Sequence, residues 1–179
     1  MLKGEKVLLR PIKKSDIYNL ATWVNDQEVN QFTSHDLPMA EVMEEQWFEK
    51  KVARTDSVIL VVEAIDCEEP KPIGSCGIHG IHMIYRNAGF GIMIGEKDYW
   101  EKGYGSEAAQ LIINFAFYRL NLNRISSAVL DFNPRSLALH KKLGFKEEGR
   151  KRESFYKNGR YCDEIIFGLL RKEWEEMKK

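Results

Sequence analysis

The apolar positions of the chain fall into short β-branched runs separated by stretches with helical spacing. Residues 5–11 (EKVLLRP) predict a strand that stops at Pro11. Ser15 then predicts the cap of a helix whose apolar positions are Ile17, Leu20, Ala21 and Val24. Pro38 predicts the start of a second helix. The β-branched residues of 57–65 (SVILVVEAI) predict a buried strand.

The second half of the chain repeats this alternation. The segments IGSCGIHGI and AGFGIMIG predict two more strands, and residues 105–120 carry the clearest helical pattern. A strand is expected at 124–131. Asn133 and Pro134 then predict a short helix, as its cap and its first-turn residue, and Gly144 predicts its end.

The chain closes with a predicted β-hairpin. Asn158-Gly159 is a residue pair typical of the tight turn between two antiparallel strands, here expected at residues 145–156 and 160–170. A charged tail, RKEWEEMKK, follows. The order is therefore strand, two helices, three strands, helix, strand, helix and hairpin, which predicts a mixed α/β fold.

Composition narrows the class of protein. The 179 residues, 44% apolar and 30% charged, predict one globular domain over 1–179. Lys and Arg number 27 and so do Asp and Glu, and this balance disfavours a dedicated nucleic-acid binder. The longest apolar run, Val58 to Val62, is too short to cross a membrane, so no membrane partner is expected. The N-terminus has no apolar secretory segment.

Cysteine and histidine spacing gives no sign of a metal site. The three cysteines form no C-x-x-C pair, which predicts a reducing, cytoplasmic location and three small apolar side chains. The histidines show no metal-ligand spacing. We therefore expect no metal cofactor at these positions: Cys67, Cys76, Cys162, His35, His79, His82 and His140.

A glycine turn precedes the clearest helix. In Trp100-Glu101-Lys102-Gly103-Tyr104-Gly105-Ser106, two glycines at spacing two let backbone N–H groups converge on an anion, and the helix N-terminus adds further amides. A tight structural turn explains the same pattern equally well. Neither a G-x-x-x-x-G-K-[ST] loop nor a full G-x-G-x-x-G motif is present.

A second motif decides between these interpretations. Asn133-Pro-Arg-Ser136-Leu-Ala-Leu-His140-Lys-Lys-Leu-Gly144-Phe145 follows the next strand. With the glycine turn, it resembles the GNAT superfamily of acetyl-CoA-dependent N-acetyltransferases, which carries a Q/R-x-x-G-x-G/A loop and an N-x-x-[SA]-x-x-[LIV]-[YH]-x-x-x-G-F helix. Over nearly the whole chain it is similar to the branch of Rim-type ribosomal-protein alanine N-acetyltransferases and spermidine N-acetyltransferases. The opening VLLRPIKKSDI and the ending EEGRKRESFYKNGRYCDEIIFGLLRKEW support this branch.

The resemblance implies a fold and a set of cofactor residues. The fold would be a mixed, mostly antiparallel sheet of about six to seven strands, with helices on both faces and a splayed strand pair at the acetyl-CoA site. The backbone of the strand before the glycine loop would pair with the pantetheine arm. Trp100 stands where many members have Gln or Arg. The implied acetyl-CoA residues are Ile92, Met93, Ile94, Lys102, Gly103, Gly105, Ser106 and Asn133.

His140 occupies the position where many members of the family have a tyrosine that protonates the departing CoA thiolate. An imidazolium with a pKa of about 6.5 can donate to a thiolate whose conjugate acid has a pKa of about 8.5. A nearby helix C-terminus favours the charged form. The alternative is a histidine that only helps to end the helix. The resemblance implies the acid role.

Gly89 is the larger departure from the family. Related sequences commonly read R-N-A-E-F-G where this chain reads Arg86-Asn87-Ala88-Gly89-Phe90-Gly91, and glycine cannot replace a carboxylate base. Other candidate bases, such as Glu63, Glu96 or Glu164, are not selected by any motif. An α-amine, with a pKa of about 7.7–8.0, loses less from a missing base than a polyamine with a pKa of about 10.4. We therefore expect a protein N-terminal α-amine as acceptor, attacked directly in a ternary complex.

Two alternatives stay open. One is acetylation of a polyamine or another small amine. An acidic early segment (Asp26, Glu28, Glu41, Glu44, Glu45) would suit a polyamine or a positively charged N-terminus, but a solvated helix face is the simpler explanation. The other is a non-catalytic module that binds CoA for sensing or interaction. The expected acceptor walls are Trp23, Phe32 and Tyr156, with Trp47 and Phe155 as further candidates, although each aromatic side chain also fits a core position. No feature decides whether the chain forms a homodimer.

Overall fold

The computed structural model describes residues 1–33, 38, 40–52 and 54–178. The chain divides into two compact units. The first unit contains Met1–His79 and Gly91–Ile112, and the second contains Gly80–Phe90 and Ile113–Lys179. The boundary between the units therefore crosses two strands and one helix: β4 (Lys71–His82), β5 (Asn87–Ile94) and α4 (Tyr104–Tyr118).

The first unit contains an antiparallel set of strands. Leu9 of β2 pairs with Leu2 of β1 and with Val62 of β3, and Val61 of β3 pairs with Ser75 of β4. Val7 and Leu9 of β2 and Val61, Val62 and Ala64 of β3 are buried, so both strands contribute apolar side chains to the core. The bounds of these strands are Leu2–Lys3 (β1), Val7–Pro11 (β2), Ser57–Ala64 (β3) and Lys71–His82 (β4).

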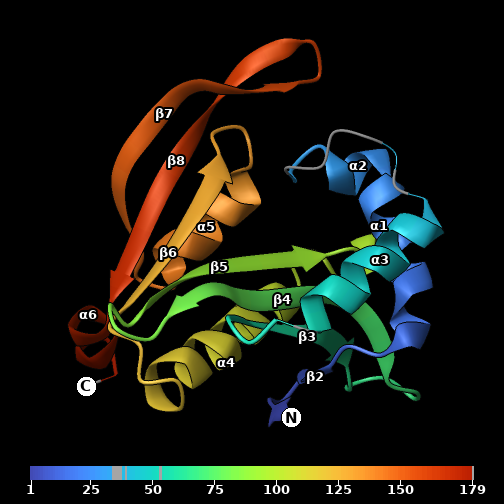
Figure 1. Ribbon diagram of the computed structural model, residues 1–179, viewed down its shortest axis with the longest axis horizontal. Coiled ribbons are helices and arrows are strands. Elements are labelled where there is room, and N and C mark those ends of the chain that lie inside the picture. Colours follow the sequence, from blue (N-terminus) through green and yellow to red (C-terminus); the bar gives the residue numbers. More distant parts are fainter. Residues whose placement is uncertain (34–37, 39, 53, 179) are drawn as a thin grey trace. The chain divides into compact units, whose positions relative to one another are not determined.

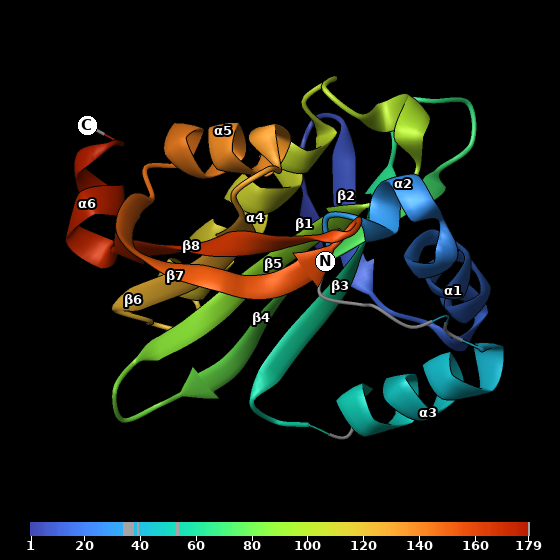
Figure 2. The same ribbon diagram turned by 90° about the horizontal axis from the view of Figure 1, so that it is seen from above.

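Three helices and two 3₁₀ turns also lie in the described part of the first unit. Helix α1 buries Leu20 and Trp23, which form a core cluster with Val29 of α2. Figure 2 shows α1, α2 and α3 close to one another. The bounds are Lys14–Asp16 (η1), Ile17–Asn25 (α1), Gln27–Asn30 (α2), Glu41–Val52 (α3) and Lys97–Tyr99 (η2).

The second unit is built around a long hairpin, β7 and β8, drawn in red and orange in Figure 1. Strand β8 also pairs with β6, and residues Asn87–Gly89 of β5 pair in parallel with Arg124–Ser126 of β6. Asn158 and Gly159 both have positive φ, 52° and 79°, as a type I′ turn requires. The bounds are Arg124–Leu130 (β6), Pro134–Lys142 (α5), Lys146–Lys157 (β7), Arg160–Leu170 (β8) and Arg171–Glu176 (α6).

The strand order is β1-β2-β3-β4-β5-β6-β8-β7, in an eight-stranded sheet. Antiparallel pairing dominates the described pairs, with β5 and β6 as the parallel pair. The mixed, mostly antiparallel fold is therefore confirmed. The sheet has one strand more than expected because the two-residue β1 carries too little pattern to be predicted. The single-domain assignment stays a prediction.

Helix ends agree with the sequence at some positions and differ at others. Asn133 Oδ1 accepts from Ser136 N–H at 3.0 Å and caps α5, and Gly144, with φ of 81°, follows its end. Ser15 is not the cap of α1, because it lies inside η1 and Asp16 directly precedes the helix. Pro38 lies three residues before α3 rather than in its first turn.

Candidate acetyl-CoA and proton-transfer sites

The glycine turn in the first unit has the geometry of an anion cradle. Gly103 has φ of 93°, a left-handed conformation that side chains disfavour. A Cβ at Gly105 would lie 3.4 Å from Ile94 Cγ1, an ordinary contact, so the start of α4 lies beside the end of β5. Glu107 N–H bonds the Gly103 carbonyl at 3.0 Å. The amides of Tyr104–Ser106 precede that bond, where a helix has no i−4 carbonyl to receive them. This arrangement fits a diphosphate.

Residues of the β1–β2 turn form hydrogen bonds with the glycine turn and with the first turn of α4. The Glu107 carboxylate accepts from the backbone N–H of Glu5 and, at 3.1 Å, from that of Lys6. The Lys6 ammonium donates to the Lys102 carbonyl at 3.1 Å and lies 5.3 Å from the centre of the Tyr104 ring. The acidic side chain in the first turn of α4 is thus bound by amides, and a cation lies beside the loop.

Replacing Gly103 with alanine should weaken acetyl-CoA binding without unfolding the protein. Space is not the obstacle, because a Cβ there would meet nothing within 4 Å. The obstacle is the left-handed φ, which costs about 1–2 kcal/mol for a residue with a Cβ. We expect the Kd for acetyl-CoA, measured by calorimetry, to rise about ten-fold (about 1.4 kcal/mol). An unchanged Kd would show that the turn does not bind the cofactor.

The backbone at the end of β5 is held by a hydrogen bond from Trp100 and by close packing against Gly74. Ile92, Met93 and Ile94 are each partly buried. The Trp100 indole N–H donates to the Ile94 carbonyl at 2.7 Å, so the residue that replaces the family's Gln or Arg stabilises the end of this strand. In β4, a Cβ at Gly74 would overlap the Met93 carbonyl oxygen, so only glycine allows this close approach. The assignment of 92–94 to the pantetheine arm stays a prediction.

Trp23, an expected acceptor wall, lies in the core cluster and is only 4% exposed. Its indole N–H donates to Glu96 at 2.9 Å, and a Cβ at Gly95 would overlap its ring. The structure therefore leaves almost none of Trp23 accessible to an acceptor. It packs instead against the residues that follow β5.

In the second unit His140 is buried in an aromatic pocket. Its side chain is 2% exposed, and its ring lies 5.0–5.9 Å from the rings of Phe90, Phe145 and Phe167. Nδ1 lies 2.7 Å from the Ser136 carbonyl and Nε2 lies 2.8 Å from Ser127 Oγ.

Burial lowers the pKa of His140 below its usual value, and the bond to Ser136 offsets part of this effect. Burial in apolar surroundings disfavours the charged ring, so the neutral form prevails at pH 7. The effect of the helix end on this ring stays a prediction. The role of His140 in proton transfer stays a prediction.

The three other candidate bases are all held in ion pairs. Glu63 accepts from Arg10 at 2.9 Å, Glu164 from Lys151 at 2.7 Å, and Glu96 pairs with Lys71. Burial raises the pKa of Glu96, but the bonds from Lys71 and Trp23 lower it by more. A carboxylate with a lowered pKa is a weaker base. Gly89 pairs regularly with Ser126, so the β5–β6 register shows no bulge there.

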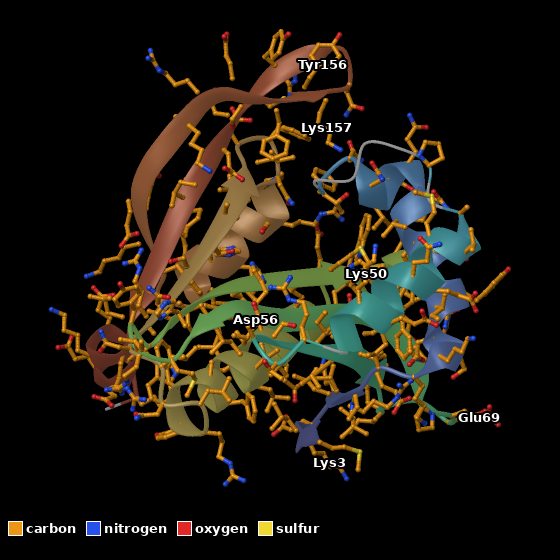
Figure 3. The ribbon with its side chains drawn as sticks, in the orientation of Figure 1. Lys3, Lys50, Asp56, Glu69, Tyr156 and Lys157 are labelled. Atoms are coloured by element: carbon orange, nitrogen blue, oxygen red, sulfur yellow. The ribbon has the colours of Figure 1, made fainter. Side chains whose placement is uncertain are left out.

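The remaining expected acceptor residues lie in different units. Phe32, in the first unit, follows α2 and is partly buried. Tyr156, in the second, is 60% exposed near the tip of the β7–β8 hairpin, where its ring meets that of Tyr161 at 5.1 Å (Figure 3). Trp47 and Phe155 are also partly buried. The part of these residues in acceptor binding stays a prediction.

The acidic early segment is largely neutralised where the structure describes it. The Lys97 ammonium lies 2.9 Å from Asp26 and 2.8 Å from Glu28, and Glu45 pairs with Lys14 at 3.2 Å. The side chains of Glu41 and Glu44 lie outside the described part. This segment therefore offers less negative charge than its sequence indicates.

Three further observations concern a buried thiol, metal binding and the length of the helices. Burial raises the pKa of Cys76 to about 12, so this thiol is protonated at neutral pH and makes a poor nucleophile. Within the described residues, no group of three or more His, Cys, Asp or Glu side chains could hold a metal ion. Among the same residues, no helix is long and apolar enough to span a membrane.

The structure adds four residues that the sequence motifs did not mark: Gly74, Trp100, Glu107 and Ser127. Gly74 carried a signal, because a glycine inside a strand indicates close backbone approach. Trp100 was visible only as a departure from the family. Ser127 had no signal, because one serine in a strand does not show which side chain of a later helix it will meet.

Comparison with known proteins identifies the class to which this fold and these sites belong. Residues 6–146 match the acetyltransferase (GNAT) domain family. The chain therefore belongs to this family, and it is an acyltransferase whose co-substrate is acetyl-CoA.

Particular relatives span most or part of the chain. It is 28% identical to the spermidine N(1)-acetyltransferase of Escherichia coli (strain K12), over 92% of this chain and 86% of that one. It is 34% identical to the putative ribosomal N-acetyltransferase YdaF of Bacillus subtilis (strain 168), over 59% of this chain and 57% of that one. The crystal structure of spermidine N-acetyltransferase from Vibrio cholerae in complex with CoA and spermine is similar in fold. Its TM-score is 0.88 at 24% identity, covering 96% of this chain and 99% of that one.

Proposed function

We propose that the protein transfers the acetyl group of acetyl-CoA to a primary amine of a polyamine, by direct attack of the amine on the thioester. The observation that carries this proposal is the likeness to a spermidine N(1)-acetyltransferase over 92% of the chain. The match to a putative ribosomal N-acetyltransferase covers 59%. The comparisons thus support the polyamine alternative better than the α-amine expected from Gly89.

The mechanism that these residues support is positioning followed by proton transfer. The amides of Lys102, Gly103, Gly105 and Ser106 would bind the diphosphate, and the backbone of Ile92–Ile94 would align the pantetheine arm. Holding thioester and amine together supplies much of the rate enhancement. Direct attack agrees with the raised pKa of Cys76, which disfavours an acetyl-cysteine intermediate.

A protein N-terminal α-amine is the second candidate acceptor. It is favoured by the YdaF match and by the missing carboxylate at Gly89, since an α-amine with a pKa of about 7.7–8.0 needs less help to lose its proton. A homodimer stays an open alternative to the monomer.

The experiment is CoA release from acetyl-CoA with a panel of acceptors at one pH. The panel contains spermidine, spermine, Ala- and Ser-starting peptides and a lysine peptide. We expect kcat/KM for a polyamine to exceed that for every peptide at least ten-fold. A peptide preferred over both polyamines would replace the acceptor assignment. Acetyl-CoA binding without CoA release for any acceptor would instead favour the non-catalytic module, and the Gly103→Ala variant shows whether that binding uses the glycine turn.

A further inference from the structure

The two nitrogens of His140 have different and fixed partners. Nδ1 lies 2.7 Å from the Ser136 carbonyl oxygen, which can only accept, so Nδ1 carries a proton. In the neutral ring Nε2 is then a bare acceptor, and it lies 2.8 Å from Ser127 Oγ. The Ser127 hydroxyl must therefore donate to Nε2 when the ring is neutral. The backbone fixes the tautomer, and the outward nitrogen is the basic one.

Ser127 has a second acceptor that suits the opposite protonation state. Its Oγ lies 3.1 Å from the Phe90 carbonyl oxygen. A hydroxyl has one proton, so it cannot donate to both partners at once. When His140 is protonated, Nε2–H donates to Ser127 Oγ and the hydroxyl proton turns to Phe90. Both protonation states are thus satisfied by the same heavy-atom positions, which is the arrangement that a proton relay needs.

The relay leads to β5, the strand that also contains the predicted pantetheine segment. Phe90 lies two residues before Ile92, and Ser127 follows directly on the Gly89–Ser126 pair. Ser127 is partly exposed, whereas His140 is 2% exposed. A proton can therefore reach the buried ring through the hydroxyl that stands between the ring and the strand.

We propose that His140 and Ser127 form the proton relay of acetyl transfer, with Ser127 as the group that meets the reacting atoms and His140 as the base behind it. This inference rests on the proposed function. As the amine nitrogen bonds to the thioester carbon, its proton passes to Ser127 Oγ while the Ser127 proton passes to His140 Nε2. As the carbon–sulfur bond breaks, Nε2–H returns a proton through Ser127 to the departing thiolate. The products are the acetylated amine and CoA thiol, and both side chains end as they began.

The surroundings of His140 suit a base that is neutral at rest. Phe90 of β5, Phe145 and Phe167 of β8 face the ring, with Ser127 of β6 and Ser136 of α5 as its polar neighbours. Lys141 and Lys142, next on α5, are exposed, as is Glu147 of β7, which pairs with Phe167. Burial and the Ser136 bond are the causes of the shifted pKa of His140, with no charged group of the described chain among them.

The relay also supplies the base that Gly89 cannot provide. The carboxylates of Glu63, Glu96 and Glu164 are each paired with a cation.

The test compares Ser127→Ala with Ser126→Ala, a neighbouring serine of the same strand whose hydroxyl accepts from Arg124 at 3.2 Å. Removing a general base lowers rates by about 10²–10⁴-fold. We expect Ser127→Ala to lower kcat at least about 100-fold with KM for acetyl-CoA unchanged, and Ser126→Ala to keep both.

The pH profile gives a second test. As the pH is lowered, the wild-type kcat should fall with a pKa below the usual 6.5 of histidine. His140→Gln and Ser127→Ala should abolish that limb, and Ser127→Thr, which keeps the hydroxyl, should restore it in part. Loss of thermal stability with the acid limb intact would overturn the relay and leave Ser127 a structural residue.

A second measurement does not depend on turnover. The ¹⁵N chemical shifts of His140 should show protonated Nδ1 and bare Nε2 at pH 7, and Ser127→Ala should shift the Nε2 resonance far more than Nδ1. An Nε2–H tautomer would overturn the relay even in an active enzyme. A wild-type protein with the expected tautomer but no CoA release for any amine would overturn the proposed function instead, and with it the use of the relay in acetyl transfer.

Discussion

Asp16→Asn should destabilise the protein by about 3–5 kcal/mol, because it leaves a buried guanidinium without its main counter-charge. Arg10 and Asp16 are 8% and 4% exposed. Two guanidinium nitrogens of Arg10 donate to the two carboxylate oxygens of Asp16, each at 2.8 Å, and its Nε donates to Glu63 at 2.9 Å. The Lys13 backbone N–H also donates to Asp16 at 2.7 Å. Asparagine keeps the shape but loses the charge and one acceptor. Urea unfolding at pH 7 measures the loss.

The pH dependence of this loss has a definite sign. Burial raises the pKa of Asp16, but the bonds from Arg10 and Lys13 lower it by more, so it lies below its ordinary value. A lowered pKa in the folded state adds stability above the unfolded pKa of about 3.9, and this stability is lost as pH falls through the folded value. The difference between wild type and Asp16→Asn should therefore be full at pH 7 and shrink below about pH 4.

The matched control is Asp56→Asn, which breaks an aspartate–arginine pair on the surface. Asp56 (labelled in Figure 3) pairs with Arg54, and its side chain is 38% exposed. Exposed pairs contribute about 0–1 kcal/mol. Equal losses for the two variants would show that burial of the Arg10 pair does not set its contribution.

The sequence predicted the parts of the fold that depend on neighbouring residues. Asn133 and Pro134 start α5, and Asn158-Gly159 forms the hairpin turn, because caps and tight turns are determined by a few adjacent side chains. Short helices were harder to predict. Four-residue α2 shows no period, although Asp26, which accepts from Glu28 N–H at 2.9 Å, is a visible cap. Helix α6 looked like a charged tail, yet its Trp174 is buried.

The candidate sites also have some features that local sequence predicts and others that depend on tertiary contacts. The glycine turn and the position of His140 could be recognised from their motifs. The protonation state of His140 could not, because it depends on Phe90 and Phe167 from distant segments and on Ser127 of β6. For the same reason, the availability of Glu63, Glu96 and Glu164 as bases became clear only when their cationic partners were known. Which charged side chains pair depends on the tertiary structure, so the numbers of charged residues in the sequence do not predict it.

Gly95→Ala should destabilise the protein by about 3 kcal/mol, at the upper end of the usual range for overpacking a core. The added Cβ would overlap the ring of Trp23, which is 4% exposed and held by its bond to Glu96 at 2.9 Å. Because Gly95 directly follows Ile92–Ile94, we also expect KM for acetyl-CoA to rise. Thermal unfolding and acetyl-CoA titration measure the two effects.

A double-mutant cycle with Trp23→Leu shows whether this contact is the cause. Each single variant should be destabilised, but the double variant should be more stable than the sum predicts, by about 1–3 kcal/mol, because the smaller side chain leaves room for the new methyl group. Gly91→Ala, in β5 four residues earlier, is the control. The added Cβ would lie 3.9 Å from His79 Cε1, an ordinary contact, so the stability of this variant should change by less than about 1 kcal/mol.

Strict additivity in the cycle would contradict the overlap with Trp23 and place the strain of Gly95→Ala elsewhere in the backbone. A positive coupling accompanied by recovery of the acetyl-CoA KM would show that the packing of α1 against the end of β5 positions the cofactor strand.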